Sequence, residues 1–230
     1  MKDLSVIITA GGIGKRMGGN FPKQFRLLAQ RPVLMHTIQV FHDFAPQAQL
    51  ILTLPAEWKE MWAELCLEHH FALPHEMVDG GKERFHSVKN ALQKCTAAKI
   101  MIHDGVRPLV SNQTLVNGYQ ALENHAGAIP TVELVDSLRW VGEGENKAVN
   151  RSDYKRIQTP QCFRKEQILT AYEVDFSENF TDDASVFEKA GFPLFLFPGN
   201  EENLKITTEN DLLLTEFWWA QHKSNSQSSK

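Results

Sequence analysis

The sequence predicts an α/β fold, with a mostly parallel, twisted sheet, helices on both of its faces, and one antiparallel hairpin that projects as an arm. Three observations predict this fold. Short β-branched or apolar runs alternate with segments whose apolar residues recur at helical spacing. The first such run, residues 6–8, opens into a loop rich in glycine. After Asp136 the alternation gives way to two short extended segments around a polar turn.

The first part of the chain alternates regularly between the two kinds of element. Strands are expected over residues 6–8, 50–54, 99–102 and 128–132, and helices over residues 33–44, 57–69, 84–92 and 114–124. Parallel strands need long crossover connections, which helices usually provide. The alternation therefore predicts a Rossmann-like sheet covered by helices on both faces.

The predicted arm covers residues 137–157. Residues 137–141 and 147–151 flank the polar tip GEGEN. Trp140 and Val141 on this hairpin need a packing partner, and a second copy of the chain would provide one. The alternative is a surface hairpin that folds back on its own domain.

The α/β pattern resumes from residue 159 to the end. The last expected elements are helices over residues 165–173, 182–190 and 209–220 and a strand over residues 194–197. A polar tail over residues 222–230 is expected to be disordered. Because no linker divides the 230 residues, we expect a single domain spanning 1–230.

Composition excludes several classes of protein. Lys and Arg number 24 against 28 Asp and Glu, so the net charge of −4 gives no overall attraction for nucleic acid. The three cysteines are odd in number and form no C-x-x-C pair, which argues against a disulfide framework or a zinc site. No apolar run is long enough for a signal peptide or a membrane span. We therefore expect a cytoplasmic protein that binds neither nucleic acid nor membrane.

The glycine loop after the first strand, residues 11–18, fits neither common nucleotide-binding motif. G-x-G-x-x-G requires glycine at Met17, and the Walker A motif requires glycine at Thr9 and a hydroxyl residue at Arg16. Glycines nevertheless let backbone N–H groups approach a ligand, while Arg16 can fork a phosphate and Lys23 adds a compact charge. The loop thus indicates a polyphosphate site, the alternative being a turn with two solvated cations.

Residues 10–17 (AGGIGKRM) and 22–24 (PKQ) resemble the signature of the sugar-phosphate nucleotidyltransferase superfamily. Five further segments narrow the resemblance to one family. They are GGKER with Ser87 and Val88, HDGVRP at residues 103–108, QTPQ at 158–161, TDDAS at 181–185, and NLKIT at 203–207. Over nearly its whole length the chain is similar to the 2-C-methyl-D-erythritol 4-phosphate cytidylyltransferases.

This resemblance implies transfer of CMP from CTP to 2-C-methyl-D-erythritol 4-phosphate, with release of pyrophosphate, in non-mevalonate isoprenoid precursor biosynthesis. It implies Mg²⁺ as the cofactor and a homodimer formed through the arm. The implied catalytic residues are cations that hold the triphosphate, namely Arg16, Lys23 and Lys205.

The resemblance also implies two sets of binding residues. Those for CTP are Ala10, Gly11, Gly12, Gly14, Gly81, Lys82, Ser87, Asp104 and Gly105. Those for the acceptor are Arg107, Asp136, Ser137, Arg151, Thr159 and Thr181, with Arg151 serving the site of the neighbouring subunit. Asp104 is expected to bind Mg²⁺.

Several of these residues have a second, structural interpretation. Asp104 could cap a helix or pair with Arg107, and Arg84 could equally be a ligand or a salt-bridge residue at a helix start. The segment from Thr181 to Asp183 resembles a helix N-cap whatever else it does. His103 is expected to position other groups and not to react.

Two other functions remain open from the sequence. A pentitol (ribitol) 5-phosphate cytidylyltransferase shares the glycine loop, PKQ and HDxxRP, although TDDAS favours the isoprenoid enzyme. A non-catalytic nucleotide-binding module could use the same fold. The chain has all four charged residues that the reaction would use, which argues against a non-catalytic module. They are Arg16, Lys23, Asp104 and Lys205.

Overall fold

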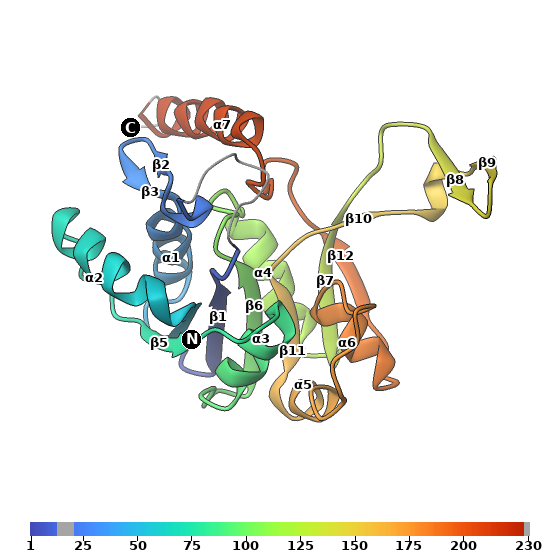
Figure 1. Cartoon of the computed structure of the whole chain (residues 1–230), viewed down its shortest axis with the longest axis horizontal. Coiled ribbons are helices and arrows are strands. Elements are labelled where there is room, and N and C mark those ends of the chain that lie inside the picture. The colour runs from blue at the N-terminus through green and yellow to red at the C-terminus, as the bar shows by residue number, and fades with distance from the viewer. Residues whose placement is uncertain (13–20, 228–230) are drawn as a thin grey trace.

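The computed structural model describes residues 1–12 and 21–227, with side chains through residue 221. Its centre is an eight-stranded sheet with strands in the order β10-β7-β11-β6-β1-β4-β5, and β12 pairs with β7 (Figure 1). The strands are β1 (Leu4–Thr9), β4 (Gln49–Leu54), β5 (Glu76–Asp79), β6 (Lys99–Asp104), β7 (Gly127–Val132), β10 (Arg156–Ile157), β11 (Gln161–Arg164) and β12 (Phe195–Pro198). Two short strands, β2 (Leu27–Leu28) and β3 (Arg31–Pro32), form a separate antiparallel pair.

The middle of the sheet is parallel, as predicted. β1 runs parallel to both β4 and β6, so that Thr9 lies opposite Thr53 on one side and Asp104 on the other. The carboxyl ends of these strands therefore meet at one edge, where open α/β sheets bind ligands.

The other half of the sheet differs from the prediction. β11 lies between β6 and β7 and runs antiparallel to both, and β10 is antiparallel to β7. Neither β11 nor β5 was predicted, because each is only four residues long and lacks a β-branched run. The sheet is thus mixed, with a parallel core.

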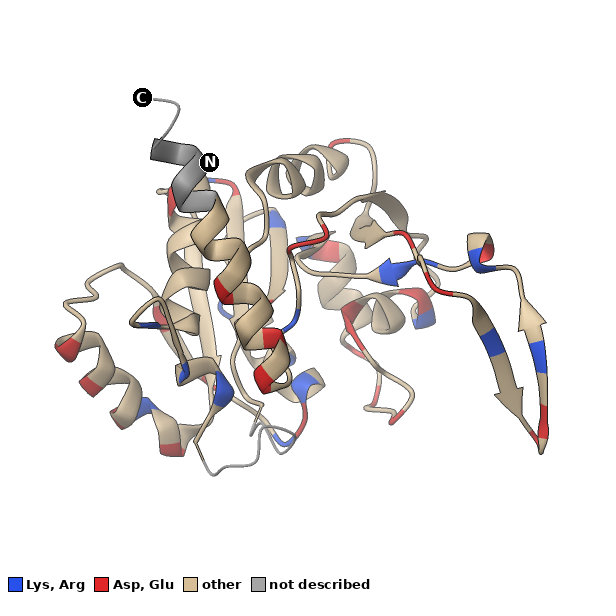
Figure 2. Cartoon of the chain, turned by 90° about the horizontal axis from the view of Figure 1, so that it is seen from above, with Lys and Arg blue, Asp and Glu red and all other residues tan. Residues whose placement is uncertain are grey.

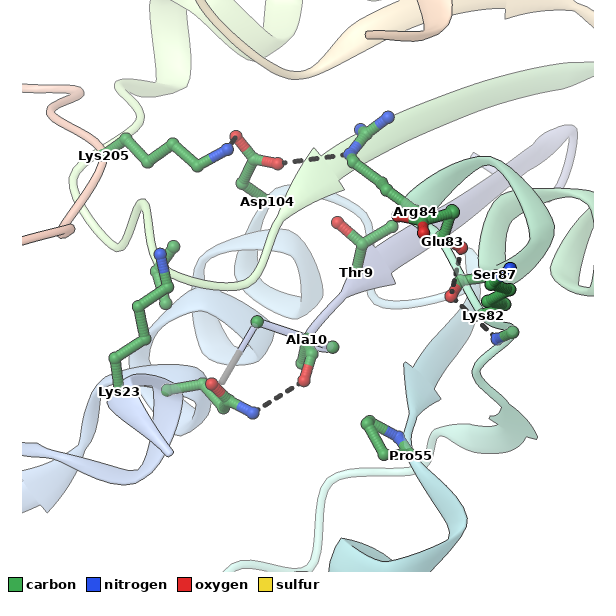
Figure 3. A pocket seen from close by; sticks show the side chains of 15 residues that line it. Thr9, Ala10, Lys23, Pro55, Lys82, Glu83, Arg84, Ser87, Asp104 and Lys205 are labelled. Carbon is green, nitrogen blue, oxygen red and sulfur yellow. Dashed lines mark hydrogen bonds and ion pairs between the residues drawn. The ribbon is translucent and has the colours of Figure 1, made fainter. Parts of the chain in front are cut away.

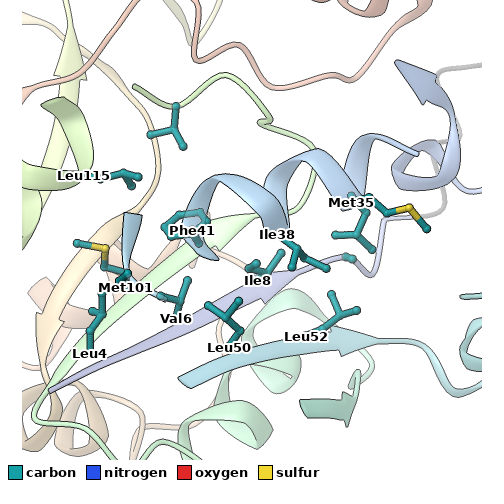
Figure 4. Close-up of a cluster of buried hydrophobic side chains, with 14 of the residues drawn as sticks. Leu4, Val6, Ile8, Met35, Ile38, Phe41, Leu50, Leu52, Met101 and Leu115 are labelled. Atoms are coloured by element: carbon teal, nitrogen blue, oxygen red, sulfur yellow. The ribbon is translucent and has the colours of Figure 1, made fainter. Parts of the chain in front are cut away.

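Helices cover both faces of the sheet. The side chains of β1 point alternately to opposite sides and pack against the helices on each face. Leu4, Val6 and Ile8 pack with buried side chains of α1 (Val33–Phe44) such as Phe41, as Figure 4 shows. Ile7 belongs to the opposite cluster, with α3 (Arg84–Leu92), α5 (Lys165–Ala171) and α6 (Asp183–Lys189). The continuous apolar run of the first strand is therefore explained by burial on two faces.

The remaining helices are α2 (Lys59–Glu68), α4 (Asn112–Ala121) and α7 (Glu209–Gln227). α4 begins before its predicted start because the Ser111 side chain accepts a hydrogen bond from the Thr114 backbone N–H and caps the helix. α7 extends beyond its predicted end near residue 220, and residues 228–230 of the predicted tail lie outside the described residues. None of the described helices has the length and apolarity that a bilayer span requires.

The predicted hairpin is present as β8 (Leu138–Gly142) and β9 (Glu145–Val149). Its turn is tighter than expected, because Glu143 and Gly144 alone connect the strands, with φ of 52° and 81°. Figures 1 and 2 show the hairpin standing away from the sheet as an arm that carries both signs of charge.

Candidate active site

Two adjoining pockets open at the edge of the sheet where β1 and β6 end. The first lies between the glycine segments, and Figure 3 shows its lining: Thr9, Ala10, Gly11, Gly12, Lys23, Gln24, Pro55, Gly81, Lys82, Glu83, Arg84, Ser87, Asp104, Val106 and Lys205. The second lies toward α6 and is lined by Arg84, Asp104, Arg107, Lys155, Ile157, Gln158, Thr159, Gln161, Thr181, Asp182 and Lys205. Arg84, Asp104 and Lys205 line both pockets.

Gly81 and Ser87 shape one wall of the first pocket. The Ser87 hydroxyl accepts a hydrogen bond from the Gly81 backbone N–H at 3.0 Å and donates to the Glu83 carbonyl at 3.2 Å. A Cβ at Gly81 would come within 2.3 Å of the Cβ of His86, so only glycine fits this close approach. Ser87 therefore fixes the backbone that faces the cavity.

The opposite wall is formed by the end of β1 and the 3₁₀ turn η2 (Lys23–Phe25). Gln24 is fully buried, and its side-chain amide donates to the Ala10 carbonyl at 2.7 Å. The Lys23 side chain passes close to Gly12, where an added Cβ would lie 3.2 Å from the lysine Cε. The start of the glycine loop is thus tied to the segment that carries Lys23.

Asp104 is the electrostatic centre of the site. Its carboxylate Oδ2 lies 3.0 Å from Arg107 Nε and 3.1 Å from Lys205 Nζ, and Oδ1 lies 3.6 Å from Arg84 Nε. Burial alone would raise the pKa of this carboxyl, but the cations of Lys205, Arg84 and Arg107 together hold the pKa well below its usual range. These cations therefore favour the ionised form of Asp104, and its pairing with Arg107 is the structural role that the sequence left open.

His103 is completely buried beneath this turn. Nε2 lies 3.0 Å from the Arg107 carbonyl, so it carries the proton, and Nδ1 accepts from the Thr159 hydroxyl at 2.9 Å. The Thr159 hydroxyl in turn accepts from the Asp104 backbone N–H at 3.1 Å. Burial lowers the pKa of His103 to about 4. This geometry fits a positioning role and no proton transfer near neutral pH.

The second pocket combines cations with a helix start. Arg107 Nη1 donates to the Asn203 carbonyl at 2.8 Å, which ties this cation to the segment before Lys205. Asp182 is the N-cap of α6. Its side chain accepts a hydrogen bond from the Ser185 backbone N–H at 2.9 Å in a capping box. The N-cap interpretation of the TDD segment is thus correct, and exposed Thr181 lines the pocket mouth.

Several predicted site residues lie elsewhere. Asp136, Ser137 and Arg151 are exposed in the arm or directly before it and line neither pocket, and the Arg151 guanidinium donates to the Val135 carbonyl. Gly105 is packed behind the pockets, where an added Cβ would lie 2.9 Å from Leu34. Gly14 and Arg16 lie outside the described residues.

Other site residues were not singled out from the sequence. Gln24 stands in the quoted PKQ segment, but only its burial shows that it holds the glycine loop. Lys155, on the return from the arm, lines the second pocket and pairs with Glu133. Neither residue has a sequence signal of its own, because both roles depend on contacts between distant segments.

Asp104 is a carboxylate that lines both pockets and is a candidate ligand for a metal ion. Among the side chains described, those of residues 1–12 and 21–221, no three from His, Cys, Asp or Glu gather as a metal-ion cage. Mg²⁺ is compatible with fewer protein ligands, since it commonly binds one carboxylate together with ligand phosphates and water. Asp104 fits that requirement because, within the part of the chain that the structure describes, the cation nearest its Oδ1 is Arg84 Nε at 3.6 Å.

Taken together, the pockets gather Lys23, Lys82, Lys205, Arg84 and Arg107 in a chain with a net charge of −4. Such a local concentration of cations favours anionic ligands. The glycine wall can approach a flat group closely, and the shared cations can bring two phosphate-bearing ligands together.

Comparisons with known proteins identify the family and the fold. The family model of 2-C-methyl-D-erythritol 4-phosphate cytidylyltransferase matches residues 4–221. The protein of that name from Bacteroides thetaiotaomicron is 47% identical over 209 residues, covering 90% of this chain and 95% of its own. The crystal structure of 4-diphosphocytidyl-2C-methyl-D-erythritol synthase from Anaerococcus prevotii superposes with a TM-score of 0.80 at 25% identity, covering 94% of this chain and 96% of that one. A crystal structure of the cytidylyltransferase from Thermus thermophilus gives a TM-score of 0.76 at 26% identity, with 94% and 98% covered.

Proposed function

The chain belongs to the 2-C-methyl-D-erythritol 4-phosphate cytidylyltransferase family, and from this premise we propose how its two pockets divide the reaction. The enzyme transfers CMP from CTP to 2-C-methyl-D-erythritol 4-phosphate, giving 4-diphosphocytidyl-2-C-methyl-D-erythritol and pyrophosphate in non-mevalonate isoprenoid precursor synthesis. We assign CTP to the first pocket and the acceptor to the second. The observation that carries this assignment is that Arg84, Asp104 and Lys205 line both.

The first pocket offers backbone groups to the base and cations to the triphosphate. Ala10, Gly11, Gly12, Gly81 and Ser87 bring the chain close enough for its N–H and C=O groups to read the edge of cytosine. Lys82 lines the same pocket, while Lys23 and Lys205 hold the triphosphate. The family resemblance assigns Arg16 and Gly14 to this set as well.

The second pocket orients the acceptor for in-line attack. Arg107, Thr159 and Thr181 line it, and the buried Thr159 hydroxyl acts through Asp104 and His103. An oxygen of the acceptor phosphate forms a bond to the α-phosphorus of CTP, while the bond from that phosphorus to the bridging oxygen breaks. The electron pair leaves with pyrophosphate. The attacking oxygen is already ionised, so catalysis consists mainly of positioning and of stabilising negative charge.

Mg²⁺ completes the proposed CTP site. When bound, this ion neutralises phosphate oxygens and holds the triphosphate in one geometry. Asp104 is the residue that we assign to it. Lys205 Nζ is 3.1 Å from Asp104 and would lie beside the same phosphates.

We propose a homodimer that forms through the arm. Trp140 and Val141 are 43% and 77% exposed on a hairpin whose two strands pair with each other and with no other described strand. Such a hairpin is marginal alone, and a second copy would bury its apolar residues. The same contact would bring Asp136, Ser137 and Arg151 of the arm to the acceptor pocket of the partner.

We also propose that the chain acts as one domain in the cytoplasm. One sheet takes its strands from residues 4 through 198, which supports the single domain. All three cysteines are free thiols, which is typical of a reducing compartment.

The test is pyrophosphate release with CTP, Mg²⁺ and each of two acceptors, methylerythritol phosphate and ribitol phosphate. We expect rapid release with methylerythritol phosphate and little with ribitol phosphate. A clear preference for ribitol phosphate would contradict the acceptor assignment. CTP binding without any release would support a non-catalytic module instead.

A further inference from the structure

Arg84 is held by protein carboxylates on both sides of its guanidinium group. Nη1 and Nη2 donate to Oδ1 and Oδ2 of Asp183 at 2.8 and 2.7 Å, and Nε faces Asp104 Oδ1 at 3.6 Å. The forked edge that an arginine uses for a phosphate is therefore occupied by Asp183. Arg84 lines both pockets, yet it is arranged to connect two carboxylates.

Asp183 is fixed from behind by Tyr172. Asp183 is fully buried at the start of α6, and the Tyr172 hydroxyl donates to its Oδ1 at 2.6 Å. Burial raises the pKa of Tyr172 well above its ordinary value, and so the phenol remains a donor. A buried carboxylate with three such donors has a single well-defined orientation.

Tyr172 also joins the two walls of the site through its ring. The ring stacks on Phe85 with centroids 4.8 Å apart and an interplanar angle of 19°, and Phe85 follows Arg84 in α3. The hydroxyl thus contacts α6, which begins next to the second pocket, and the ring contacts α3, which begins next to the first. The contact connects them without touching either cavity in the described structure.

We propose that Tyr172 and Asp183 are positioning residues that hold Arg84 against Asp104. Because Arg84 then faces Oδ1, the other oxygen of Asp104 is left to Lys205 and Arg107. The position of Lys205 Nζ between the pockets therefore depends on a hydroxyl that meets no substrate. This inference rests on the roles proposed above for Asp104 and Lys205.

The test compares two variants that each remove one phenol hydroxyl from a carboxylate. Tyr172→Phe keeps the stacked ring, and Tyr119→Phe is the matched control, since Tyr119 donates to Asp3 at 2.8 Å and lines neither pocket. For Tyr172→Phe we expect kcat to fall about tenfold, while the calorimetric Kd for CTP stays within about twofold. Tyr119→Phe should change neither quantity by more than about twofold.

Arg84→Lys extends the test, because lysine keeps the charge but loses the fork to Asp183. It should show the same separation of kcat from CTP affinity, with a larger loss of kcat. An unchanged kcat in Tyr172→Phe, or an equal loss in Tyr119→Phe, would overturn the inference. A weakened CTP Kd with normal kcat in Tyr172→Phe would overturn it too, because it would indicate a direct role in binding.

Lys205→Met in the same assay separates this inference from the function on which it rests. Full activity of Lys205→Met would remove the proposed role of Lys205 and the inference with it. An inactive Lys205→Met beside a fully active Tyr172→Phe would leave the proposed function intact and refute only the positioning role.

Discussion

The Thr159 hydroxyl donates to Nδ1 of His103 at 2.9 Å, inside the core and next to the site. The same hydroxyl accepts from the Asp104 backbone, and the other ring nitrogen donates to the Arg107 carbonyl. The neutral imidazole thus holds both ends of the turn that carries the central carboxylate. Protonation would add a donor at Nδ1, where the structure requires an acceptor.

This relationship predicts a pH dependence of stability. Burial lowers the pKa of His103 from 6.5 to about 4, so only the unfolded chain takes up this proton between those values. The stabilisation that neutral His103 gives the folded chain is complete above about pH 6.5. It declines as the pH falls toward 4, and the free energy of unfolding drops by up to about 3 kcal/mol.

This decline can be measured by urea unfolding at about pH 7.5, 6, 5 and 4. These values run from about one unit above the ordinary histidine pKa to well below it. His103→Gln should flatten the profile between pH 6.5 and 4, although it lowers stability at every pH. His42→Gln, which changes a histidine in the last turn of α1, is the control and should retain the decline. A wild-type profile as flat as that of His103→Gln would contradict the prediction.

Two glycines of the first pocket predict opposite outcomes for the same substitution. An alanine Cβ at Gly81 would meet His86 at 2.3 Å, so Gly81→Ala must displace the backbone held by Ser87. We expect kcat/KM for CTP to fall roughly 10- to 100-fold. At Gly11 nothing lies within 4 Å of an added Cβ among the described residues, so Gly11→Ala should leave the free energy of unfolding within about 0.5 kcal/mol of wild type, while Gly81→Ala should lower it. Equal effects at the two positions would argue against a closely fitted glycine wall.

The arm predicts a charge-sensitive dimer. Val141→Asp places a carboxylate on its apolar surface, and Leu67→Asp makes the same kind of change on α2, where the side chain is also 77% exposed. We expect Val141→Asp to sediment as a monomer and to lose turnover by at least about tenfold, because the acceptor pocket would lack Arg151 of the partner subunit. Leu67→Asp should remain dimeric and active. A monomeric wild type with full activity would refute the proposed dimer.

The parallel core could be predicted because its strands are short, β-branched and separated by helical patterns. β1 and β4 are examples, as both are buried on two faces. β11 could not, since Cys162 and Phe163 form a strand only by fitting between β6 and β7. Its pairing depends on contacts distant in sequence, which local periodicity does not carry.

The candidate site, like the sheet, could be predicted only in part from the sequence. Resemblance placed Lys23, Asp104 and Lys205 at one site, and the structure brings them to one pocket. The partnership of Arg84 with Asp183 spans 99 positions and depends on how α3 and α6 pack. Nothing in either segment alone distinguishes a ligand arginine from one held by a buried carboxylate.

Lys205 provides the most direct test of the central claim, that one cation beside Asp104 serves both pockets. Lys205→Met should lower the rate of pyrophosphate release from CTP and methylerythritol phosphate by on the order of 10²- to 10³-fold while the protein remains folded. Lys99→Met is the matched control, because Lys99 pairs with Glu123 at the opposite end of β6 and should leave the rate unchanged. Release by Lys205→Met at the wild-type rate would contradict the account.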